Sequence, residues 1–263
     1  MPRGLQVISL GPGFDAPVNG LPANLTKLSL TGLFNQELKG TVELQHLTLG
    51  FYFNQPLQGL RLPNLLSLTL GHDFHQSWDG LAELMPQLLS LNFGGVFPGH
   101  VILPKSLETL ALCKRFNQSL EILSLPENLQ ELILAGEFNQ TLQYVSFPQL
   151  KSLTLAGEFN QSVEEVKFPS SLEDLKFGFR FNQALERVVF PQLRHLTFGH
   201  EFNQSLDSAC FPDTLQSLTF GWNFNHRLVK LCKLKSLTLK HFFNQSFMAW
   251  AAFLFLMTSG QQL

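Results

Sequence analysis

The sequence is poor in charged residues. Asp, Glu, Lys and Arg together make up 14% of its 263 residues, and the formal net charge is −2. Proteins that bind nucleic acid or anionic membranes by electrostatics carry a basic patch or stripe, and this sequence has none. We therefore expect neither nucleic acid nor an anionic membrane surface among its partners.

Cysteines and long apolar runs are also scarce. Cys113, Cys210 and Cys232 have no C-x-x-C spacing, so the sequence predicts neither a zinc site nor a disulfide framework. The apolar stretch 247–257 has eleven residues, whereas about twenty are needed to span a bilayer. We expect no membrane span, and we interpret residues 247–263 as an apolar cap or tail that covers the end of the core.

Motifs of catalysis are missing as well. The chain has no nucleophile motif, no glycine-rich phosphate loop and no paired carboxylates. His72, Asp73 and His75 form one suggestive cluster, but they share a single turn and imply no deep pocket. We predict a protein that is not an enzyme, with no catalytic, cofactor-binding or metal-binding residues.

The amino terminus, Met1-Pro2-Arg3-Gly4, has no apolar signal-peptide stretch. Several N-Q-[ST] sequences match the glycosylation acceptor pattern, and a secretory route would expose them to modification before folding. An intracellular, cytoplasmic location is the simpler expectation.

Phenylalanine is abundant and regularly spaced. Twelve phenylalanines each lie nine residues after a leucine, at intervals of 19 to 23 residues, and nine of them precede asparagine. They are Phe14, Phe34, Phe53, Phe74, Phe97, Phe116, Phe138, Phe159, Phe181, Phe202, Phe224 and Phe243. A unit this short cannot bury its own apolar face and must stack on its neighbours, which predicts a solenoid.

Each unit has a rigid half and a tolerant half. The rigid half reads L-x-x-L-x-[LF]-G-x-x-F-N-Q-x-L, and its alternating leucines indicate a short strand. Length variation falls in the second half, where V-x-F-P sequences favour an extended segment and leave little room for helices. We predict an all-β-rich, right-handed, leucine-rich-repeat-like β-solenoid of about twelve rungs over residues 1–246.

Glycine follows the predicted strand in most units, at the first position, as in Gly178 and Gly199, or at the second, as in Gly136 and Gly157. Both positions lie where the chain must turn towards the next phenylalanine. The sequence predicts a turn with positive φ at these glycines.

The asparagine that follows each phenylalanine is interpreted as structural. A turn in a stacked solenoid exposes backbone groups, and a buried amide can bond the turns of adjacent rungs into a ladder. The residues assigned to this ladder and to the phenylalanine stack are Asn117, Asn139, Asn160, Asn182, Asn203, Phe138, Phe159, Phe181 and Phe202.

The outward columns of the strands are dominated by hydroxyls, since fourteen of their twenty-four residues are Ser or Thr. We interpret them as a candidate protein-binding face formed by Ser152, Thr154, His195, Thr197, Ser217, Thr219, Ser236 and Thr238. The alternative is an ice-binding or other surface-recognition ladder, which Glu131, Ile133, Asp174 and Lys176 would interrupt. The residue just before the phenylalanine is charged in five successive units and places opposite charges on neighbouring rungs, which predicts surface ion pairs along the column Arg115, Glu137, Glu158, Arg180 and Glu201.

These repeats resemble FNIP repeats, a leucine-rich-repeat-like group named for its phenylalanine–asparagine signature. The match extends over about residues 5–247, and Phe53-Asn54-Gln55-Pro56-Leu57 comes nearest to the signature. Most units carry Ser, Thr or Ala where Pro56 stands, so these are variant repeats. The resemblance implies a non-catalytic scaffold for protein partners. In that family such arrays can accompany effector domains, so the chain is alternatively expected to be a fragment of a larger protein.

Overall fold

The computed structural model describes residues 4–18, 20–41, 43–97, 101–112, 115–228, 231 and 233–245. The predicted cap or tail at 247–263, Cys113 and Cys232 lie outside the described residues.

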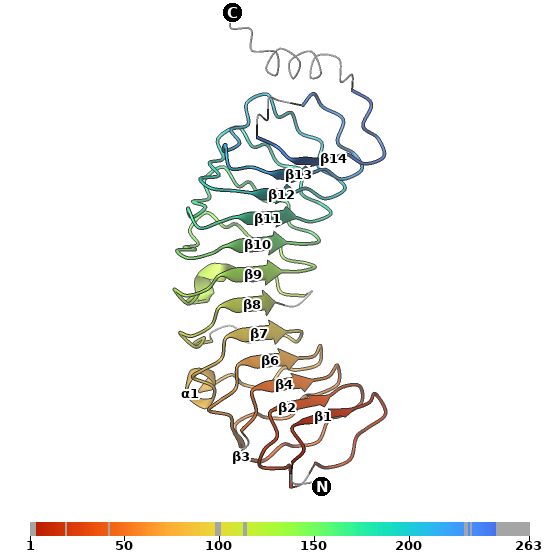
Figure 1. The fold of residues 1–263 in the computed structure, drawn as a ribbon, viewed down its shortest axis with the longest axis vertical. Coiled ribbons are helices and arrows are strands. Elements are labelled where there is room, and N and C mark those ends of the chain that lie inside the picture. The colour runs from red at the N-terminus through yellow and green to blue at the C-terminus, as the bar shows by residue number, and fades with distance from the viewer. Residues whose placement is uncertain are drawn as a thin grey trace, which may run out of the picture.

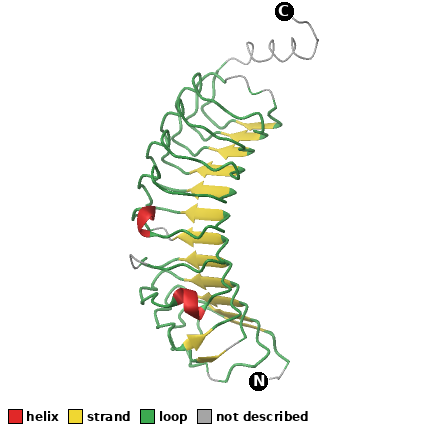
Figure 2. Cartoon of the chain, turned by 90° about the vertical axis from the view of Figure 1, so that its left-hand side faces the viewer, coloured by secondary structure: helices red, strands yellow, loops and turns green. Residues whose placement is uncertain are grey.

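The chain forms a solenoid around one long parallel sheet, which confirms the predicted fold class. Twelve strands follow one another in chain order, one from each repeat. They are β1 (Val7–Leu10), β2 (Lys27–Leu30), β4 (His46–Leu49), β6 (Ser67–Leu70), β7 (Ser90–Phe93), β8 (Thr109–Leu112), β9 (Glu131–Leu134), β10 (Ser152–Leu155), β11 (Asp174–Phe177), β12 (His195–Thr197), β13 (Ser217–Thr219) and β14 (Ser236–Thr238). Figure 1 shows the strands as rungs, and Figure 2 shows the stack bent into a crescent with the strands along its inner side.

The strands pair in a register that aligns equivalent repeat positions. Leu153, for example, pairs with Leu132 on one side and with Leu175 on the other. This register explains the constant leucine-to-phenylalanine interval, because one extra residue would turn every inward side chain of a strand outward.

Leucines and phenylalanines fill the interior. The rings of Phe138, Phe159, Phe181 and Phe202 are fully buried and stack with successive centroid distances of 5.9, 6.0 and 6.1 Å. Complete burial of one such side chain stabilises the fold by about 1.5–3 kcal/mol. The core is thus a continuous column rather than a set of separate clusters.

The tolerant halves are less extended than the sequence suggests. They contain the short helix α1 (Leu81–Leu84), the 3-10 helix η1 (Leu120–Ile122) and a two-stranded parallel sheet of β3 (Gly40–Thr41) and β5 (Leu60–Arg61). These helices have only four and three residues, so the described tolerant halves contain almost no helix, which agrees with the prediction of little room for helices. The unit that holds α1 is the longest, at 23 residues, and Gly80 turns the chain into the helix with φ 74°.

The predicted glycine conformation is correct only at the second position after the strand. Gly32, Gly136 and Gly157 have positive φ, whereas Gly178 and Gly199, at the first position, do not. A Cβ on Gly199 would overlap the backbone oxygen of Gly178 in the rung before it. At the first position, glycine is required by close backbone stacking rather than by positive φ.

Candidate functional site

The structure gathers the predicted strand-face residues into two columns. Ser217 and Ser236 pair in one column, and Thr197, Thr219 and Thr238 are consecutive in the other. Lys176 pairs with both Thr154 and Thr197, so it interrupts the second column. All eight predicted residues are half-buried or exposed. The uninterrupted threonine column is three rungs long, which is short for a surface that would match a lattice.

The asparagines link successive turns by a repeated pair of hydrogen bonds. The Asn160 Oδ1 atom accepts from the backbone N–H of Asn182 and from Nε2 of Gln183, both at 2.9 Å. The Asn182 Oδ1 atom accepts from the backbone N–H of Asn203 at 2.8 Å and from Nε2 of Gln204 at 3.1 Å. We call this chain of contacts the amide ladder. The glutamine that follows most of these asparagines is also part of it, whereas His226 follows Asn225 and its ring contacts the Asn203 carbonyl.

The amide ladder is not buried, which corrects the sequence-based interpretation. Asn117 and Asn203 are exposed, and Asn139, Asn160 and Asn182 are half-buried, whereas the phenylalanines beside them are fully enclosed. The turns lie at the rim of the solenoid, so the acceptor oxygens contact neighbouring turns while the side chains remain in contact with water.

Exposed apolar side chains gather beside this ladder. We define the turn edge as the residues one and two positions before each repeat phenylalanine, in the turns that follow the strand arrowheads in Figure 1. Among the described residues, seven of the twelve exposed large apolar side chains belong to it: Leu33, Phe51, Tyr52, Val96, Phe179, Trp222 and Phe242. The concentration distinguishes this edge from the strand face, where the predicted residues are small and polar.

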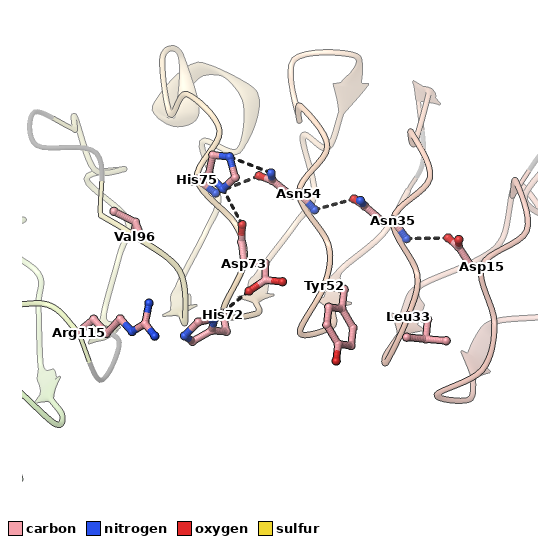
Figure 3. A pocket seen from close by; sticks show the side chains of 10 residues that line it. All are labelled: Asp15, Leu33, Asn35, Tyr52, Asn54, His72, Asp73, His75, Val96 and Arg115. Atoms are coloured by element: carbon pink, nitrogen blue, oxygen red, sulfur yellow. Dashed lines mark hydrogen bonds and ion pairs between the residues drawn. The ribbon is translucent and has the colours of Figure 1, made fainter.

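A groove of about 680 Å³ runs along the amino-terminal part of the turn edge. Figure 3 shows its two sides. One side is formed by Leu33, Tyr52, His72 and Arg115, and the other by Asp15, Asn35, Asn54 and His75. Asp73 lies between the two sides, and Val96 lies beyond them near the Arg115 end. We call this the turn-edge groove. The groove is lined by His72, Asp73 and His75, the cluster that the sequence places in one turn. The sequence implied no deep pocket there, whereas the structure places the cluster in an open groove.

His75 stands where most repeats have the ladder asparagine. Its backbone N–H donates to Asn54 Oδ1 at 3.1 Å, which is the ladder hydrogen bond to the preceding rung. The Nδ1 atom of its ring is hydrogen-bonded to the Asp73 carbonyl at 2.9 Å, and its Nε2 atom is hydrogen-bonded to Asn54 Nδ2 at 3.0 Å. A neutral ring that donates from Nδ1 and accepts at Nε2 satisfies both contacts.

The two ends of the groove differ in charge. The Asp15 Oδ1 atom accepts from the backbone N–H of Asn35 at 2.9 Å and from Gln36 Nε2 at 3.0 Å, and these bonds lower the pKa of the Asp15 carboxyl. At the other end, the Arg115 guanidinium points towards His72 in Figure 3. Within the described part of the chain, Arg115 takes part in no ion pair.

The charged column of the turn edge forms ion pairs farther along the solenoid. Arg180 contacts Glu201 at 2.6 Å and Glu158 at 3.3 Å. The hydrogen bond and charge of Glu201, with the charge of Glu158, raise the pKa of Arg180. The predicted ion pairs are therefore present at Arg180, whereas Arg115 forms none with the residues that the structure describes.

A stack of four aromatic rings occupies the carboxy-terminal part of the turn edge, three of them exposed and the ring of His200 half-buried. Ring centroids are separated by 4.8 Å between Phe179 and His200, 5.2 Å between His200 and Trp222, and 5.7 Å between Trp222 and His241. This stack was not predicted from the sequence. Its signal was present in the repeat, because Phe51, His72 and these four residues share one position.

Other site types find no support in the described residues. None of their His, Cys, Asp and Glu side chains form a group of three that could hold a metal ion. No helix in this part of the chain is both long and apolar enough to cross a membrane. Cys210 is a free, exposed thiol.

Comparison with protein families confirms the resemblance to FNIP repeats. The family model described as FNIP Repeat matches residues 116–157, 159–201 and 202–232, so this part of the chain consists of FNIP repeats. Among curated proteins, none matches the sequence.

A solved structure shows the same architecture. The crystal structure of CroV588, described as a novel circular LRR protein structure, is 27% identical with a TM-score of 0.55. The match covers 93% of this chain and 48% of CroV588, so the chain spans about half the length of that protein. The fold is thus a leucine-rich-repeat-like solenoid.

Proposed function

We propose that this FNIP-repeat solenoid is a non-catalytic scaffold that binds partner proteins through its turn edge. The observation that supports this most directly is the concentration of exposed apolar side chains along that edge. Single exposed apolar residues are common on soluble proteins, whereas contiguous patches mark interaction sites. The repeat architecture supplies the length that such a surface requires.

The composition of the turn edge fits a protein partner. Tyr52, Trp222 and Arg115 belong to the residue types that are enriched at protein interfaces and contribute most to binding. Asp15 and Asp73 line the same groove as Arg115, and such carboxylates would repel a nucleic acid backbone.

The strand face is the second location considered for a partner. Its hydroxyl groups and His195 would supply hydrogen bonds, and it lies on the inner side of the crescent in Figure 2. It offers few apolar anchors, which is why we place the main contact on the turn edge.

Two variants separate these locations. The first changes Leu33, Tyr52 and Val96 to Ser, and the second changes Thr154, Thr197 and Thr219 to Glu. Each is compared with the natural chain by affinity capture from source-cell extract and quantitative mass spectrometry, after circular dichroism has shown that both fold. We expect the first variant to lose a partner that the second retains. Loss in the second alone would move the contact to the strand face, and identical results for all three chains would refute the proposal.

A further inference from the structure

We infer that the turn-edge groove binds an extended polypeptide segment, with a cationic side chain at its Asp15 end and a carboxylate at its Arg115 end. This inference rests on the proposed function and specifies the chemistry of the partner.

The negative end of the groove has a charge that the fold does not require. Asp15 occupies the ladder position, where Asn35 and Asn54 provide the same acceptor oxygen without a charge. The ladder uses Oδ1 of Asp15, which leaves the second carboxylate oxygen of this exposed residue available to a partner. A cationic side chain is the complementary group.

The positive end is likewise unused by the fold. Arg180, in the same column of the repeat, is held between two glutamates, whereas no glutamate pairs with Arg115 in the described residues. Arg115 is exposed and lines the groove. Guanidinium groups bind carboxylates with two parallel hydrogen bonds, so an Asp, a Glu or a chain terminus would fit here.

The floor between the charged ends is partly apolar. Leu33, Tyr52 and Val96 line the groove and are each about half exposed, at 52%, 47% and 55%. In Figure 3, Leu33 and Tyr52 are neighbours, and Val96 lies nearer the Arg115 end, beyond His72 and Asp73. A polyanion would meet these apolar side chains and the two aspartates, whereas a peptide can place apolar side chains on them. We therefore favour a polypeptide over a nucleic acid.

The length of the segment follows from the number of rungs. Asp15 belongs to the coil of β1 and Arg115 to the coil of β8, five strand spacings farther along the sheet. At about 4.8 Å per spacing the two ends are about 24 Å apart, and an extended chain covers that distance with roughly seven residues. The segment would lie along the solenoid axis, across the turns.

A selection experiment tests this chemistry. A phage-displayed library of random linear peptides is selected on the folded full-length chain, and the affinity of an enriched synthetic peptide is measured by fluorescence polarisation. We expect enriched sequences to have Lys or Arg separated by several mostly apolar residues from Asp or Glu. Arg115→Glu should weaken binding roughly tenfold, as expected for loss of a charge-assisted hydrogen bond. Replacing the acidic residue of the peptide by Lys should then restore affinity.

Asp15→Asn provides the matched test at the other end. It keeps the ladder oxygen and removes the charge, so we expect only a small change in thermal unfolding and weaker binding of peptides with a basic end. A selection that enriches no charge pattern, or an affinity that neither substitution alters, would overturn the inference. If capture of the natural partner still depends on Leu33, Tyr52 and Val96 in that case, the proposed function stands without it. Dependence on Thr154, Thr197 and Thr219 instead would overturn both.

Discussion

At the scale of single residues, the amide ladder requires an acceptor oxygen more than a particular side chain. Asparagine provides it in most rungs, and Asp15 provides it in the first. Because the ladder is partly exposed, each bond competes with water, and its contribution to stability is moderate.

Removing two adjacent ladder residues should lower stability. Asn160→Ala with Asn182→Ala removes the acceptors of four hydrogen bonds, at about 0.5–1.5 kcal/mol each. We expect the free energy of unfolding to fall by about 2–6 kcal/mol in total, towards the lower value because the ladder is partly exposed to water. Thermal and denaturant unfolding followed by circular dichroism measure the change. Asn160→Asp with Asn182→Asp, which keeps the oxygens, should lose less, and equal losses would show that the acceptor is not what matters.

The lowered pKa of Asp15 implies that part of the folding stability depends on pH. The hydrogen bonds from Asn35 and Gln36 favour the ionised carboxylate, so their stabilisation is complete above its ordinary pKa of 3.8. It is lost as the pH falls below that value and through the folded-state pKa. NMR titration of the Asp15 carboxyl carbon should give a pKa below 3.8, and Gln36→Ala should raise it. A value at or above 3.8 in the natural chain would contradict this role.

At the scale of elements, the close stacking of turns depends on glycine. A Cβ on Gly199 would overlap the backbone of Gly178, whereas a Cβ on Gly11, in the first coil, meets nothing within 4 Å. The first position after the strand therefore has no room for a Cβ at Gly199, inside the stack, but has room for one at Gly11, in the first coil.

This difference predicts unequal effects of one substitution. Gly199→Ala should force two rungs apart. We expect it to lower the free energy of unfolding by about 1–3 kcal/mol, the usual cost of overpacking a core. Gly11→Ala is the matched control and should be nearly neutral. Denaturant unfolding of both variants measures the difference. Equal stability would mean that the turns tolerate a methyl group.

The strands and the core were predictable because their signals are periodic. In every unit the phenylalanine lies nine residues after the first leucine, as Phe181 does after Leu172, and such a constant spacing within a short repeat implies parallel strands in register. The turn-edge groove was not predictable in the same way. The groove depends on how far side chains such as Tyr52 and Arg115 project beside the buried rings. The repeat pattern of the sequence does not predict that distance. His75 and Asp15, which depart from the repeat asparagine, were the one local signal of the groove.

At the scale of the whole molecule, stability is distributed along the stack. Each strand of the long sheet pairs only with the strands next to it in chain order. In such a quasi-one-dimensional protein, the free energy of folding approximates a sum of repeat and neighbour terms.

Deletion of one complete repeat should therefore be tolerated. Removing residues 150–171 joins equivalent repeat positions, because Leu172 then stands where Leu150 stood. We expect a folded protein with cooperative unfolding and a modestly lower melting temperature. Removing residues 150–160 disrupts the register and should prevent folding. Similar circular dichroism spectra for the two deletions would argue against the repeat as the folding unit.

The central claim, that a partner protein contacts the turn edge, is tested most directly by site-specific photocrosslinking. A photoreactive amino acid is placed at Val96 on the turn edge or at Thr154 on the strand face, and each chain is irradiated in source-cell extract. We predict a specific crosslinked partner from position 96 and only background from position 154. A partner crosslinked from position 154 and absent at position 96 would contradict the account.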